Sequence, residues 1–257
     1  MEKDNLGDWR IQAVTCLAKD VPAAYPGGPS HKAGTPVYLT TKVEDDSHKT
    51  IGYFHTPSPS ALALGIANES AQRARRLWPT IASQVVVTPT GLGLSVVPEN
   101  LPHLYDYFQL CMTVTVFCFQ ALEAFCNYAI ATKLSGTYNL KRNRGHIKAD
   151  AHTLQRRAST EEKLAEILPA ILSVSSPRET HLWAQFQKLK EVRDATVHIK
   201  RSRGPNQIFD EHKLFSRFFQ ETIDEYLDNT IQIISHFIPS TGEFRWFSLA
   251  VEKINTK

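Results

Sequence analysis

Hydrophobic and small side chains in the second half of the chain recur with the period of a helix. Within residues 101–136 they repeat every three or four positions, which predicts one helix of about 30 residues that ends at Gly136. The positions of this stripe are Leu104, Phe108, Cys111, Thr115, Cys118, Leu122, Phe125 and Ala129. The same period predicts further helices over residues 159–172, 177–199 and 210–237. A bundle of four helices is therefore expected here.

The first 100 residues follow a different pattern, in which β-branched and aromatic side chains form short runs. The runs at residues 35–43 and 50–55 flank the polar stretch EDDSHK and predict a β-hairpin. Residues 84–97 predict a second hairpin, and residues 60–78 between the two have helical composition.

The last segment, EFRWFSLAVEK, alternates between apolar and polar residues as a strand does, so residues 239–257 are expected to form a strand-like tail. The expected fold class is α+β. A mainly α-helical C-terminal domain occupies residues 101–238, and a smaller β-containing region of unassigned role occupies residues 1–100.

Composition indicates an ordinary globular protein. Of the 257 residues, 42% are hydrophobic and 21% charged, and the formal net charge of +3 is too small to indicate a nucleic-acid binder by itself. The four cysteines form no CxxC motif, and three of them share helical core spacing; they are Cys16, Cys111, Cys118 and Cys126. Reduced core cysteines and a charged N-terminus without an apolar signal segment predict a cytoplasmic protein.

The apolar stretch at residues 108–131 is long enough to cross a membrane. Gln120, Glu123 and Asn127 interrupt its second half, where a carboxylate is costly in lipid. We therefore expect a buried helix of a soluble bundle and no membrane association.

Other chemistries find no support among the motifs. The sequence holds no HExxH or HxxEH motif, no cysteine cluster and no GxSxG motif, and its GLGLS segment is not followed by a predicted helix. No metal or cofactor is expected.

Candidate chemistry lies near the end of the helix predicted at residues 177–199. Its apolar stripe consists of Leu182, Phe186, Leu189, Val192, Thr196 and Ile199. Arg193 falls within this stripe, and a guanidinium that faces a bundle is costly unless an acidic group meets it. Arg193 is thus expected either to pair with a buried carboxylate or to lie at a cleft that receives an anion.

His198 points about 140° away from Arg193 on an ideal helix, so the two do not converge within one straight helix. Asp194 precedes His198 by four residues, on nearly the same face, and could hold its imidazole by a hydrogen bond. The alternative is a surface Asp-His pair together with an arginine bonded to an internal carboxylate.

Two basic clusters accompany this helix. Lys200, Arg201 and Arg203 follow His198. The stretch between the first two predicted helices, expected to be a polar loop, carries Lys141, Arg142, Arg144, Lys148, Arg156 and Arg157. The clusters indicate either a surface for a polyanion or ordinary solvated loops.

The segments ALEAFCNYAI (121–130), EEKLAEILP (161–169) and LWAQFQKLKEVRDATVHIK (182–200) together resemble the HEPN superfamily, over residues 101–238. The ribonuclease members of this all-helical family carry an arginine and a histidine with four to six residues between them. Arg193 and His198 match that motif. The resemblance implies cleavage of RNA without a metal, in a composite site where the motifs of two protomers face each other.

The resemblance also implies roles for individual residues. His198 would be the general acid and base acting on the ribose 2′-OH or the leaving 5′-oxygen, and Arg193 would hold the scissile phosphate. Asp194 would orient His198, and Glu123 is a candidate partner for Arg193. The expected products carry a 2′,3′-cyclic phosphate and a 5′-OH. Lys200 stands where some toxin members have a tyrosine that their antitoxin modifies, so that modification is not expected.

Three hypotheses follow. The first is a toxin-like or antiviral-defence endoribonuclease, which forms a homodimer, binds single-stranded RNA through the residues Lys200, Arg201, Arg203, Lys141, Arg142 and Arg144, and is controlled by an antitoxin or regulatory protein. The second is a catalytically inactive HEPN-type module that binds RNA or protein. The third is a helical protein of another family in which Arg193 forms a buried structural ion pair.

Overall fold

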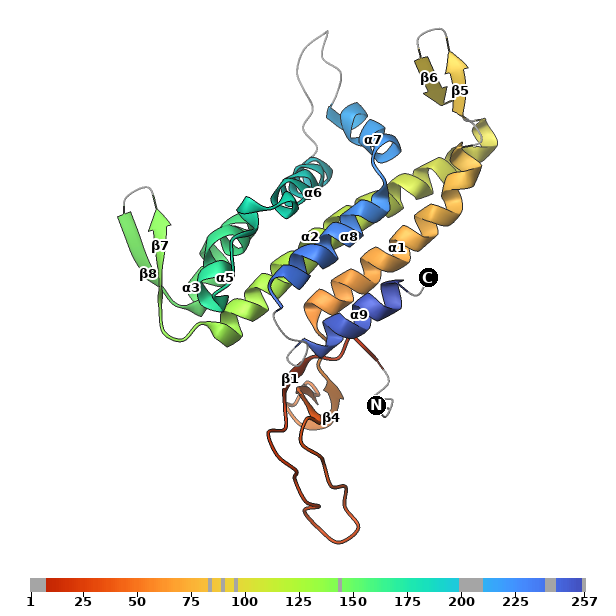
Figure 1. Ribbon diagram of the computed structural model, residues 1–257. Helices are drawn as coiled ribbons and strands as arrows, with labels where there is room; N and C mark the ends of the chain where they lie inside the picture. Colours follow the sequence, from red (N-terminus) through yellow and green to blue (C-terminus); the bar gives the residue numbers. More distant parts are fainter. Residues whose placement is uncertain are drawn as a thin grey trace. The chain divides into compact units, whose positions relative to one another are not determined.

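The computed structural model in Figure 1 describes residues 8–82, 85–88, 91–94, 97–142, 145–198, 210–238 and 244–255. The chain divides into two compact units, one formed by Met1–Leu62 with Ile238–Lys257 and the other by Ala63–Phe237. The fold is α+β, with a small β part before a helical region, as the sequence predicts.

The first unit contains two antiparallel β-pairs. Strand β1 (Ala13–Cys16) pairs with β2 (Pro36–Tyr38), and β3 (Thr40–Glu44) pairs with β4 (Thr50–His55). The β3–β4 pair confirms the hairpin predicted between residues 35–43 and 50–55. Its turn is fixed by Asp45, whose side chain accepts hydrogen bonds from the backbone N–H groups of Ser47 and Lys49.

The strand expected at the C-terminal end of the chain is wrong, because the segment forms helix α9 (Arg245–Asn255). Trp246, Phe247 and Ala250 are buried, at a spacing that fits one face of a helix. In so short a segment, apolar–polar alternation and a helical stripe share most positions, and burial decides between them.

The second unit begins within helix α1 (Pro59–Ala82), so it includes segments from the first 100 residues. Strands β5 (Val85–Thr88) and β6 (Gly91–Leu94) pair in antiparallel fashion, which confirms the hairpin predicted at residues 84–97. A 3₁₀ turn, Pro98–Asn100, then leads into the helices.

Helix α2 (Leu101–Lys133) is the centre of this unit and confirms the predicted long helix. Helices α6 (His181–Val197) and α8 (Ile223–His236) pack against α2 and against each other (Figure 1). Aromatic pairs join them: Phe119 of α2 stacks on Phe186 of α6, with ring centroids 6.1 Å apart.

Cys111, Cys118 and Cys126 are fully buried in α2, as predicted for core residues. In the part of the chain that the structure describes, the segment Pro98–Lys133 alone is long and apolar enough to cross a membrane. Half of its most apolar stretch is buried inside the molecule. Core helices of soluble proteins share these properties, so the expected location of the protein stays a prediction.

The stretch after α2 was expected to be a polar loop, but most of it forms regular secondary structure. It forms the hairpin of β7 (Tyr138–Arg142) and β8 (Gly145–Ala149), followed by the short helix α3 (Ala151–Arg157). The apolar residues of these strands alternate with charged ones, which suits a hairpin with one buried face. Asp150 caps α3 by accepting a hydrogen bond from the Thr153 N–H.

The second predicted helix is confirmed, with an interruption. It consists of α4 (Thr160–Glu162), a π-helical turn (Lys163–Ile167) and α5 (Leu168–Leu172). Ser159 begins it with a capping box: its hydroxyl accepts from the Glu162 N–H, and the Glu162 carboxylate accepts from the Ser159 N–H.

The last two predicted helices differ in their bounds. Helix α6 starts after a 3₁₀ turn, Pro177–Glu179, and is capped by Thr180. The helix predicted over residues 210–237 is two helices, α7 (Asp210–Gln220) and α8. The buried residues shift phase between them, from Phe218 to Ile223, a step of five that one helical face does not contain. The break lets both apolar faces pack.

Candidate functional site

Arg193 lies on the side of α6 that faces α2, as its place in the apolar stripe predicts. Its guanidinium stacks over the ring of Phe119, 3.7 Å from the ring centroid. The side chain is only 23% exposed, and its Nε is buried without a hydrogen-bond partner. An aromatic face, rather than a buried carboxylate, therefore meets this cation.

Among the described residues, Arg193 pairs with the carboxylate of its neighbour in sequence, Asp194. Nη1 of Arg193 lies 3.0 Å from Oδ1 of Asp194, whose side chain is 40% exposed. Glu123, the expected partner, is exposed on α2 and forms no ion pair with Arg193 in the described structure. The residue of α2 that meets Arg193 is instead Phe119, one helical turn before Glu123.

Asp194 contacts His198, but through the backbone. The backbone carbonyl of Asp194 accepts a hydrogen bond of 2.9 Å from the His198 N–H. The carboxylate of Asp194 instead pairs with Arg193 and with Lys190, 3.5 Å away. The expected hydrogen bond between the Asp194 carboxylate and the imidazole is not formed among the described contacts.

His198 is the first residue beyond α6, with φ −119° and ψ 59°. These angles are not helical, so the angle of 140° expected on an ideal helix does not apply to its side chain. The residue is exposed. Arg193 and His198 thus lie near the end of the same helix, the first packed against a ring and the second exposed, and no hydrogen bond joins their side chains among the described contacts.

Of the six residues expected to bind RNA, the structure describes two, Arg142 and Lys141. Arg142 has a structural position, because its guanidinium pairs with Glu162 and donates a hydrogen bond of 2.8 Å to the Arg157 carbonyl. Lys141 is exposed. The remaining four expected RNA-binding residues, Arg144, Lys200, Arg201 and Arg203, lie outside the described residues.

One face of the β7–β8 hairpin is polar and basic. The register places Lys141 opposite His146 and Asn139 opposite Lys148, so these side chains share a face. Leu140 on the other face is buried. Helix α3 carries two further exposed cations, Arg156 and Arg157. The only acidic residue of this stretch, Asp150, is engaged in capping.

Helix α2 and the π-helical turn enclose a buried ammonium group that the sequence did not predict. Lys163 is 1% exposed, and its Nζ donates to the Asn127 side-chain oxygen at 2.8 Å and to the Gln155 carbonyl at 2.9 Å. Burial lowers the pKa of Lys163, while Cys126 and Glu123 oppose that shift. The signal in the sequence is a lysine inside the apolar run of a helix.

A pocket between α1, α2, α7 and α8 was not predicted either, because the sequence assigned α1 to a different region from the other three helices.

Comparison of the chain with family models, curated proteins and solved structures finds no match. The function therefore has to be argued from the geometry of the residues themselves.

Proposed function

We propose that this protein is a metal-independent endoribonuclease of the HEPN type that cleaves single-stranded RNA. One observation carries the proposal: Arg193 is held at the end of α6 on an aromatic platform, and His198, the next residue of the motif, is exposed just beyond the helix. An accessible imidazole can transfer a proton, and a fixed guanidinium can stabilise the charge on a phosphate, so the two groups suit RNA cleavage without a metal.

Each group has a defined task. The imidazole of His198 takes the proton of the ribose 2′-OH, whose oxygen then attacks the adjacent phosphorus, and a second imidazole returns a proton to the leaving 5′-oxygen. The guanidinium of Arg193 binds a phosphate oxygen and stabilises the charge that develops on it. Cyclisation needs no water, and it leaves a 2′,3′-cyclic phosphate and a 5′-OH.

A second copy of the chain completes this site. Among the described contacts no hydrogen bond joins Arg193 and His198 of one protomer, and two such helix ends facing each other would supply two imidazoles and two guanidinium groups to one phosphate. The proposed assembly is accordingly a homodimer, in which α6 of each protomer contributes to the interface.

The basic face of the β7–β8 hairpin supports RNA as the substrate. Its exposed cations, Lys141 and Lys148, share one face of the hairpin, and Arg156 and Arg157 of α3 are exposed as well. Such a surface binds the phosphate backbone without regard to sequence, and the binding weakens as salt rises.

The ion pair between Arg193 and Asp194 favours a second candidate function, an RNA- or protein-binding module without turnover. A carboxylate 3.0 Å from the guanidinium competes with phosphate for it. The two functions differ in one outcome: the module binds RNA and leaves it intact.

The test is cleavage of a labelled single-stranded RNA by the full chain in excess chelator. Wild-type protein should produce a 2′,3′-cyclic phosphate, whereas His198→Ala and Arg193→Ala should each lose at least 100-fold in rate, which is typical for acid–base and charge-stabilising groups (roughly 10²–10⁴-fold). His103→Ala, an exposed histidine of α2, is the matched control and should retain full activity. Undiminished cleavage by His198→Ala would exclude the assigned site.

RNA binding should be measured in the same variants. Retained binding together with lost cleavage in His198→Ala supports the nuclease, and binding without cleavage by the wild type supports the module. For the basic face, Lys148→Ala should weaken binding and reduce its salt dependence. Lys49→Ala, an exposed lysine of the other unit, should change neither.

A further inference from the structure

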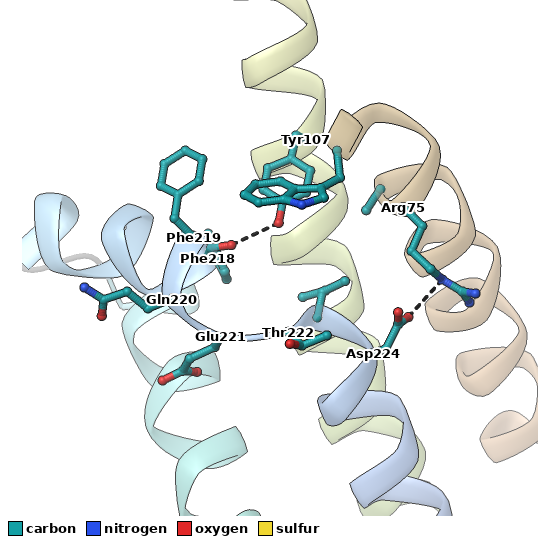
Figure 2. Close-up of a pocket in the computed structure, with 11 residues that line it drawn as sticks. Arg75, Tyr107, Phe218, Phe219, Gln220, Glu221, Thr222 and Asp224 are labelled. Carbon is teal, nitrogen blue, oxygen red and sulfur yellow. Dashed lines mark hydrogen bonds and ion pairs between the residues drawn. The ribbon is translucent and has the colours of Figure 1, made fainter. Parts of the chain in front are cut away.

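A pocket with an aromatic wall lies where α7 ends and α8 begins (Figure 2). Its volume is about 190 Å³, and side chains of α1, α2, α7 and α8 line it. Pockets for drug-sized ligands usually measure about 300–1,000 Å³. This one has room for a single head group.

Three aromatic rings form its wall. Trp78 of α1 lies 5.4 Å from Tyr107 of α2 and 6.1 Å from Phe219 of α7, measured between ring centroids. The Tyr107 hydroxyl donates a hydrogen bond of 2.9 Å to the Phe218 carbonyl, which Figure 2 shows as a dashed line. The rings thus hold one another, and Trp78 and Phe219 remain partly exposed.

A carboxylate with incomplete hydrogen bonding stands at one end of this wall. Oδ1 of Asp224 is buried without a hydrogen-bond partner, and it lies 3.1 Å from Arg75 Nε, outside hydrogen-bond alignment (Figure 2). The Asp224 side chain as a whole is 31% exposed, and that of Arg75 is 47% exposed. The Asp224 side chain is thus open to the pocket through its exposed part only, while Oδ1 is closed to solvent and Arg75 is about half exposed.

The residues that line the pocket include two carboxylates, Asp224 and Glu221, and a single cation, Arg75. Glu221 is already engaged with Arg217 and Lys188, and it accepts a hydrogen bond from the Tyr226 hydroxyl. Glu225, in the first turn of α8, pairs with Lys188 at 3.5 Å, and Asp228 lies one turn further on. The carboxylates of the lining outnumber its cation, which favours a cation over an anion as the bound group.

We infer that this pocket binds the head group of an organic cation, either an alkylammonium or a guanidinium. The face of a tryptophan attracts such a group through its π electrons, and a neighbouring carboxylate supplies the opposite charge. The head group enters beside Trp78 and adds a second cation to Asp224. A free amine or guanidine and a lysine or arginine side chain of a protein partner carry the same chemistry.

Arg75 gives the inference a distinctive consequence. It shields Asp224 and repels an incoming cation, so removing its charge should strengthen binding. If the ion pair between Arg75 and Asp224 is purely structural, no ligand binds to the wild type, and none binds after either partner has lost its charge.

The experiment is a titration of the full chain, monitored by the amide chemical shifts of Trp78, Thr222 and Asp224. The probes are methylguanidinium and ethylammonium, with acetate and methyl phosphate as anionic controls. Saturable shifts with the two cations alone are expected. Asp224→Asn should abolish them, Trp78→Leu should weaken binding several-fold, and Arg75→Gln should tighten it several-fold.

Preference for either anion, absence of saturation with both cations, or weaker binding by Arg75→Gln would overturn the inference. Circular dichroism of each variant verifies folding, and Trp78→Phe replaces Trp78→Leu if the latter unfolds. Short acetylated and amidated peptides containing one Arg or one Lys separate the two sources. Tighter binding of a peptide than of its head group assigns the site to a protein side chain, and equal binding assigns it to a small molecule.

Discussion

The guanidinium of Arg193 lies over the ring of Phe119 at 3.7 Å from the ring centroid, so a cation of α6 packs directly on an aromatic residue of α2. The contact offsets part of the cost of burying charge, and it fixes the direction of the guanidinium relative to the bundle. Arg193 is therefore both a group of the candidate site and a packing residue that stabilises the helical unit.

Arg193→Lys should therefore destabilise the fold while keeping the charge. Lysine cannot stack a planar group on Phe119, and we expect the free energy of unfolding in urea to fall by about 1–2 kcal/mol. Arg178→Lys is the matched control, because Arg178 lies over Trp183 at 5.3 Å with its side chain 47% exposed. Its loss should be smaller, and equal losses in the two variants would contradict the stacking argument.

The Lys163–Asn127 pair should behave as a coupled unit. Asn127→Leu leaves a buried ammonium with one acceptor fewer and should cost about 3 kcal/mol of unfolding free energy. Lys163→Met should cost about 1–3 kcal/mol, because it leaves the Asn127 and Gln155 oxygens without a donor. The double variant should be at least about 1 kcal/mol more stable than the sum of the single losses implies. Additive losses in urea unfolding would mean that the two residues act independently.

Glu162 makes the stability of the second helix depend on pH. Burial opposes the shift, but hydrogen bonds from Ser159 and the charge of Arg142 hold the pKa of Glu162 below its ordinary value of 4.5. The folded state thus favours the charged form, and its contribution is present above pH 4.5 and is lost as pH falls through the lowered pKa.

The difference in unfolding free energy between wild type and Glu162→Gln should accordingly be about 1 kcal/mol at pH 7 and should shrink below pH 4.5. Urea unfolding at a series of pH values measures it. Glu69→Gln, an exposed glutamate of α1, is the control and should show no such trend. A difference that grows as pH falls would reverse the assigned sign.

The thiols of α2 should be unreactive in the folded protein. Burial raises the pKa of Cys111 and of Cys118 to about 12, and it raises the pKa of Cys126 as well. In a Cys16→Ser background, a disulfide reagent at pH 8 should therefore label no thiol until denaturant is added, and then all three. Rapid labelling of any of them in the native state would show that α2 is not a core helix.

Short-range signals explain what could be predicted. The long stripe of α2, the hairpin of β3 with β4 and the start of the second helix near residue 159 depend on residues a few positions apart, and each is where the sequence places it. The apolar stripe of the predicted helix also places Arg193 correctly on the inner face of α6, because α6 is regular up to that residue.

The predictions that were wrong concern long-range contacts, the ends of helices and a short segment with an ambiguous pattern. The ring that meets Arg193 belongs to another helix, and no spacing along the chain reveals it. The angle assigned to His198 assumed a helix that had already ended. The tail that forms α9 has a pattern shared by strands and helices, and only burial of Trp246 and Ala250 separates the two.

The π-helical turn Lys163–Ile167 contains one residue more than an α-helical turn between the same ends would need. Deleting a residue there would restore regular α-helical bonding, but it would also rotate one side of the turn relative to the other by about 100° about the helix axis. Either the ammonium of Lys163 would leave Asn127, or the side chain of Leu168 would leave the core. The length of the chain at this turn thus allows one helical segment to bury both a charged and an apolar side chain.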